Sequence, residues 1–108
     1  MRALCYAQTN IGSGRDNNED NYYCNGTFKR DPAIPVAEAA AEQESRRLIY
    51  GVFDGMGGEE RGEMASYLAA KAAFSTLRSG TPRQTLEAVC QNANLDICHF
   101  IEENGLGT

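Results

Sequence analysis

A single aspartate ends an apolar run and is followed by a turn rich in glycine. The run LIYGVF covers residues 48–53, Asp54 follows it, and four glycines occur between positions 55 and 62. A carboxylate at the end of a buried strand is costly unless it is paired or binds a metal ion. Glycines let the backbone approach a ligand, and Mg²⁺ and Mn²⁺ prefer carboxylate, carbonyl and water oxygens. The turn therefore indicates a site for a divalent cation, with a helix cap by Asp54 as the purely structural alternative.

The same turn does not fit the two common phosphate-binding patterns. The Walker A pattern needs Lys and then Ser or Thr after its last glycine, but Glu63 and Met64 stand there. The dinucleotide-binding pattern fails as well, because Glu60 occupies the position of its third glycine. These acidic side chains would also repel a phosphate unless metal ions intervened. A nucleotide-binding loop is therefore disfavoured.

A second acidic turn, GRDNNEDN, lies earlier in the chain at residues 14–21. Glu19 and Asp20 are adjacent in it, and Arg15 stands four residues before Glu19. Asn and Asp are natural turn formers, so a solvated turn is a sufficient explanation of this segment alone. The functional interpretation is a second set of oxygen ligands with one guanidinium group for an anion. Two such turns, each beside a strand, could converge at one end of a sheet.

Strand patterns come first along the chain. Residues 3–8 and 21–28 are short, aromatic and bounded by Gly or Asn, and residues 48–53 are apolar enough for a strand covered on both faces. Residues 29–47 contain two prolines and then become rich in Ala and Glu, which indicates an exposed insertion with about two turns of helix.

Two helix patterns follow the strands. Residues 59–78 carry alanines on nearly every face, which is typical of a helix packed on more than one side. A second helix is predicted from the capping box at residues 81–84, an apolar stripe over 86–100 and a stop at 104–105. Strands followed by two antiparallel helices predict an α+β fold.

The composition is that of a small globular domain. The chain has 108 residues, of which 23% are charged, and its net charge of -5 argues against binding to nucleic acid. No apolar run approaches the length of a membrane span, and the first residues lack the apolar core of a signal peptide. The four cysteines show no C-x-x-C spacing, so we expect reduced, buried thiols in a cytoplasmic protein.

Taken together, the two acidic turns resemble a known family. GRDNNEDNYY followed by VFDGMGGEERGEMAS is similar to the bacterial branch of the metal-dependent protein phosphatase 2C (PPM) family, whose motifs read approximately R-x-x-N-E-D, D-G-M-G-G and G-E-x-A-S. The resemblance covers most of the chain outside residues 29–47. The matching positions are Arg15, Asn18, Glu19, Asp20, Asp54, Gly55, Met56, Gly57, Gly58, Gly62, Glu63, Ala65 and Ser66.

The resemblance implies a four-layer α/β/β/α sandwich with a two-metal site that holds Mn²⁺ or Mg²⁺. Asp54 would bridge the two ions, and the Gly55 carbonyl would bind one of them. Glu19 and Asp20 would hold metal-bound waters or ligate directly, and Arg15 would bind the substrate phosphate. A water acidified by both cations would then attack phosphoserine or phosphothreonine in a protein.

The resemblance also implies that residues 1–108 are the N-terminal part of the catalytic domain. Met56 stands where many eukaryotic members carry a histidine, and bacterial members commonly have Met there. The family's remaining metal aspartates would lie beyond Thr108, so we expect the chain alone to be a poor or inactive phosphatase that self-associates through uncovered apolar faces.

Two other functions are considered beside the phosphatase. The main alternative is a phosphatase-like module that binds or regulates a partner without catalysis. A Mg²⁺-dependent nucleotide binder is disfavoured by the failed glycine patterns.

Overall fold

The computed structural model describes residues 1–44, 47–55 and 61–105. The described elements are strands followed by two helices, as expected outside residues 29–47, and every strand pairing found in these ranges is antiparallel. The α+β class is therefore confirmed. The elements are β1 (Arg2–Asn10), β2 (Asp20–Cys24), β3 (Thr27–Phe28), β4 (Val36–Glu44), β5 (Tyr50–Asp54), α1 (Gly62–Ser75) and α2 (Pro82–Glu103).

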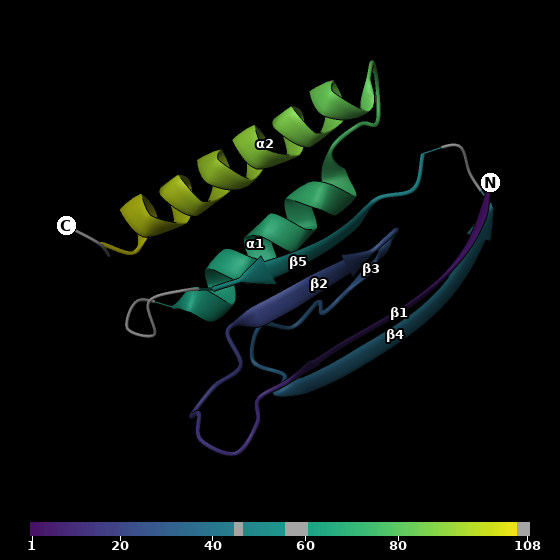
Figure 1. Ribbon diagram of the computed structural model, residues 1–108. Coiled ribbons are helices and arrows are strands. Elements are labelled where there is room, and N and C mark those ends of the chain that lie inside the picture. The colour runs from purple at the N-terminus through teal and green to yellow at the C-terminus, as the bar shows by residue number, and fades with distance from the viewer. Residues whose placement is uncertain (45–46, 56–60, 106–108) are drawn as a thin grey trace.

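The strands form two sheets, with the orders β1-β4 and β3-β2-β5. Figure 1 shows the helices over one face of the three-stranded sheet and the two-stranded sheet on its other side. Helix α1 packs against both the sheet and α2, and the two helices run antiparallel. The described part of the chain therefore forms three layers, α/β/β.

The hydrophobic core lies between the three-stranded sheet and the helices. Tyr23 and Phe28 come from the sheet, Ala70 and Ala73 from α1, and Val89 from α2. The small alanine side chains of α1 let it approach the sheet on one side and α2 on the other. The prediction that this helix is packed on more than one side is confirmed.

The helical turns predicted within residues 29–47 are wrong. Residues Val36–Glu44 form strand β4, which pairs with β1 over its whole length. Exposed and half-buried positions alternate along β4, as expected for a strand with one covered face. Ala and Glu favour helices when neighbours do not decide, but pairing with β1 decides the structure here. The segment is also not exposed throughout, because Lys29 at its start is buried.

Two details of the other strands differ from the predictions. A turn at Asn25 and Gly26, with φ of 41° and 113°, divides the expected single strand into β2 and β3. Asn-Gly suits such a hairpin turn because both residues tolerate positive φ. Strand β5 lies at the edge of its described sheet and is covered on one face only, since Val52 is 87% exposed and Tyr50 is 47% exposed.

The helix ends follow their local signals. The Thr81 hydroxyl accepts a hydrogen bond from the Gln84 amide, and the Gln84 side chain accepts one from the Thr81 amide, so the predicted capping box is present. Helix α1 ends at Ser75, before the predicted position 78, and its predicted start at residue 59 lies outside the described ranges. Among the described helices, none is long and apolar enough to cross a bilayer.

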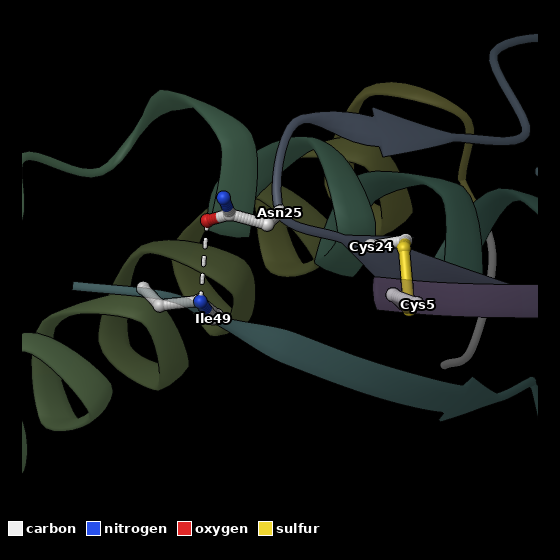
Figure 2. The surroundings of a disulfide bond; sticks show 4 residues. All are labelled: Cys5, Cys24, Asn25 and Ile49. Carbon is white, nitrogen blue, oxygen red and sulfur yellow. Dashed lines mark hydrogen bonds between the residues drawn. A yellow bond between two sulfur atoms is a disulfide. The ribbon is translucent and has the colours of Figure 1, made fainter. Parts of the chain in front are cut away.

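The cysteines contradict the prediction of reduced, buried thiols. Cys5 on β1 and Cys24 on β2 are joined by a disulfide that links the two sheets, with their Cα atoms 6.5 Å apart (Figure 2). Cys90 and Cys98 are free and exposed. The sequence spacing carried no sign of the pairing, because the two cysteines become neighbours only when the sheets pack.

Candidate metal site

The two acidic turns meet at one end of the three-stranded sheet. Asp20 is the first residue of β2 and Asp54 is the last residue of β5, and the two are direct partners in the antiparallel ladder. Side chains of directly opposed residues point to the same face of a sheet. Both aspartates are exposed. The strand register therefore places both side chains on the same face of the sheet, where each is exposed.

Glu19, Gly55 and Gly62 form the junction between the two turns and helix α1. Glu19 contacts both of the other residues. Its backbone oxygen accepts a hydrogen bond from the Gly55 amide at 3.1 Å, which extends the contact between the two turns past Asp54. Its carboxylate lies against the Cα of Gly62, the first residue of α1. The partial positive charge of a helix N-terminus favours a carboxylate at this place.

Gly55 and Gly62 permit this close packing. A Cβ on Gly55 would collide with the carbonyl oxygens of Gly62 and Glu19, and a Cβ on Gly62 would collide with the Gly55 carbonyl and the Glu19 carboxylate. These two glycines are therefore required by close approach of the backbone. The Gly55 carbonyl lies against Gly62 within the junction, and its role as a metal ligand stays a prediction.

A side-chain hydrogen bond connects the first acidic turn to the start of α1. The Asn17 amide group donates to the Glu63 carboxylate at 2.8 Å, and Glu63 lies in the first turn of α1. The buried Ser66 hydroxyl donates to the backbone oxygen of Glu63 at 3.3 Å. Glu63 and Ser66 thus hold the start of α1 beside the first acidic turn. Asn17 was not singled out in the sequence, because a surface Asn in a turn is common.

Arg15 is exposed in the segment between β1 and β2. None of the contacts found among the described residues fixes its guanidinium group, so its expected approach to a substrate phosphate stays a prediction. The motif positions Met56, Gly57 and Gly58 lie outside the described ranges.

The side chain of Asn18 holds the first acidic turn in place through hydrogen bonds to its neighbours. Its buried side-chain amide donates to the Thr9 hydroxyl and to the Pro35 carbonyl, each at 2.9 Å. Its side-chain oxygen accepts a hydrogen bond from the Asp20 amide at 3.0 Å. Asn18 therefore ties the acidic pair to β1 and to the segment before β4, a structural role that the motif match alone does not reveal.

The acidic residues at this end of the sheet are candidate ligands for a divalent cation, and metal binding there stays a prediction. Asp20, Asp54 and the neighbouring Glu19 offer the carboxylate oxygens that Mg²⁺ and Mn²⁺ bind. Two directly opposed carboxylates repel each other, and a cation between them would relieve this repulsion. Within residues 1–44, 47–55 and 61–105, no group of three or more His, Cys, Asp or Glu side chains is arranged to hold a metal ion.

Comparisons with known proteins add no relative. No protein-family model, no curated protein and no solved structure matches this chain. The two sequence motifs and the strand register that joins them are therefore the features of this chain that bear on its function.

Proposed function

We propose that residues 1–108 supply the first part of a two-metal site that hydrolyses phosphoserine and phosphothreonine in proteins. The observation that carries the proposal is the direct pairing of Asp20 with Asp54 across β2 and β5, next to Glu19. Carboxylates from two separate turns share one exposed end of a sheet, as the resemblance to metal-dependent protein phosphatases requires.

Each residue has a distinct part in this proposal. Two divalent cations, Mn²⁺ or Mg²⁺, would supply an activated water and offset the negative charge of the phosphate. Asp54 and Asp20 would hold the cations, with Glu19 and the Gly55 carbonyl as further oxygen ligands. Arg15 would bind the phosphate through its guanidinium group. The exposure of both aspartates supports a phosphorylated protein segment as the substrate.

A second candidate is a phosphatase-like module that binds a partner without catalysis. The exposed apolar side chains of Val52 and Leu86, at 87% and 52%, support this alternative because such side chains are often covered by a partner. The retained acids Asp20 and Asp54 count against it, since a pure binding module does not need them.

We propose a cytoplasmic protein of bacterial signalling whose partner is a phosphorylated protein, with neither nucleic acid nor a membrane involved. The net charge of -5 supports the exclusion of nucleic acid. The Cys5–Cys24 disulfide weighs against a reducing compartment. Alkylation of thiols in intact cells tests the location: a reactive Cys5 supports the cytoplasm, and a protected one contradicts it.

Hydrolysis of a phosphothreonine peptide by the full-length gene product that contains these residues tests the activity. We expect turnover with Mn²⁺, loss of turnover with EDTA, and loss in the Asp54→Asn variant. The matched control is Asp16→Asn, which removes an exposed carboxylate of the same turn and should keep the activity. Full activity of Asp54→Asn in Mn²⁺ would show that the proposed role is wrong.

A further inference from the structure

A lysine side chain is buried beneath the first acidic turn. Lys29 follows β3 directly and is only 2% exposed. Its ammonium group donates to the backbone oxygens of Asn18 at 3.2 Å and Ile34 at 3.3 Å. Lysine is almost never fully buried without such partners, because taking its charge out of water is costly.

Lys29 is bonded to the residues on both sides of the acidic pair. Its ammonium group binds the carbonyl of Asn18, the residue before Glu19. Its backbone amide donates to the Asn21 side chain at 2.9 Å, and its backbone oxygen accepts from the same side chain at 2.8 Å. Asn21 follows Asp20 and is buried. Glu19 and Asp20 are thus held between two residues that both bind Lys29.

Nearby carboxylates favour the charged form of the buried Lys29 ammonium group. Burial lowers the pKa of Lys29, while the carboxylates of Asp20, Glu63 and Asp31 act in the opposite direction. Asp20 begins β2 at the end of the first acidic turn, and Glu63 lies in the first turn of α1 directly after the second. The ammonium group therefore lies within electrostatic reach of Asp20 and of the start of α1, while its hydrogen bonds go to backbone oxygens.

We propose that Lys29 is a positioning residue for the Glu19–Asp20 pair. Its ammonium group fixes the Asn18 carbonyl, and this contact orients the first acidic turn toward Asp54. The consequence for metal binding rests on the proposed function, whereas the consequence for the order of the turn does not.

The sign of the effect on metal affinity separates positioning from simple charge. Removal of a positive charge beside an acidic site strengthens its attraction for a cation. Loss of positioning weakens the binding instead. Lys29→Met removes the charge and the hydrogen-bond donor from a buried side chain of similar length. Lys71→Met is the matched control, because Lys71 is exposed on α1 and lies outside the turn.

Amide hydrogen exchange and Mn²⁺ titration, both followed by NMR, test the proposal. In folded Lys29→Met we expect faster exchange at the Asp20 and Gly55 amides, which bind Asn18 and Glu19 in the native protein. We expect the Mn²⁺ dissociation constant to rise about tenfold, as for other residues that orient metal ligands. Lys71→Met should leave the exchange unchanged and the affinity equal or tighter.

Either of two results in a folded Lys29→Met protein would overturn the inference. The first is unchanged hydrogen exchange at the Asp20 and Gly55 amides. The second is Mn²⁺ binding that is unchanged or tighter than in the native protein. If the native protein binds no Mn²⁺ at this end of the sheet, the proposed function fails, and the exchange rates alone decide whether Lys29 positions the turn. If Lys29→Met does not fold, Lys29→Gln replaces it, with the same two measurements and the same criteria.

Discussion

Asp54 faces Asp20 across the β2–β5 ladder, and this single register explains why two distant turns can form one site. The two carboxylates carry like charges, so directly opposite positions are unfavourable for them when no cation is bound. A residue placed for metal binding is therefore expected to reduce the stability of the metal-free protein.

The Asp54→Asn variant tests this expectation. In EDTA its free energy of unfolding should be about 0.5 kcal/mol higher than that of the native protein, because the repulsion with Asp20 is removed. Urea denaturation measures the difference, with Asp16→Asn as the control for loss of an exposed carboxylate. A clearly less stable Asp54→Asn protein would mean that Asp54 has a structural role that its neighbours do not explain.

The close packing of Gly62 leads to a second expectation at the residue scale. Alanine favours helices over glycine by about 1 kcal/mol, so Gly62→Ala at the start of α1 would stabilise the helix if space allowed. The added Cβ would instead collide with the Gly55 carbonyl and the Glu19 carboxylate, and we expect a net loss of about 1–3 kcal/mol.

Thermal denaturation of Gly62→Ala provides the measurement. Gly14→Ala is the control, because a Cβ at Gly14 meets no atom within 4 Å. Equal or higher stability of Gly62→Ala would show that the junction between the two turns is looser than described.

At the scale of elements, the sequence predicted the helix end that local residues determine. It did not predict the strand that forms only because it pairs with another strand. The capping box at Thr81 is local, and α2 begins there. Strand β4 has a composition that favours helix, and only its pairing with β1 makes it a strand. The same distinction between local signals and contacts in the folded chain applies to the candidate site. Asp20 and Asp54 were found from their motifs, whereas the contribution of Lys29 depends on contacts formed only in the folded chain.

The turn at Asn25 connects β2 and β3 and also contacts the segment before β5. The Asn25 side-chain oxygen accepts a hydrogen bond from the Ile49 amide at 3.2 Å, which ties the β2–β3 turn to the start of β5 (Figure 2). Asn25→Gly loses this bond and should cost about 1 kcal/mol. Asn25→Ala also places a Cβ at a φ of 41°, which adds about 1–2 kcal/mol.

Chemical denaturation of both variants should therefore rank native protein above Asn25→Gly and Asn25→Gly above Asn25→Ala. An alanine variant as stable as the glycine variant would contradict the positive φ at this position.

At the scale of the whole molecule, apolar side chains remain uncovered on β5 and α2. Val52, Leu86 and Leu95 are 87%, 52% and 58% exposed. A groove of about 640 Å³ runs between the two sheets and is lined in part by Val52 and Tyr50. Burial of such surface releases roughly 25 cal/mol per Å², so a modest contact between copies is favourable.

We therefore expect self-association that depends on this groove. Sedimentation velocity should show a mass above that of the monomer at high concentration, and Val52→Thr should shift the protein toward the monomer. Val36→Thr is the control, because Val36 is also exposed but lies on β4, outside the groove. A native protein that stays monomeric at every concentration would contradict the expectation.

The most direct test of the central claim is a Mn²⁺ titration of the native chain followed by paramagnetic broadening of its amide signals. This measurement detects a weak, water-rich site and assigns it to residues. We predict that the signals of residues 19–21 and 53–55 broaden first, that EDTA restores them, and that Asp54→Asn reduces the effect. Broadening that begins at another acidic segment, such as the glutamates of β4, or that favours no segment, would contradict a metal site at Asp20 and Asp54.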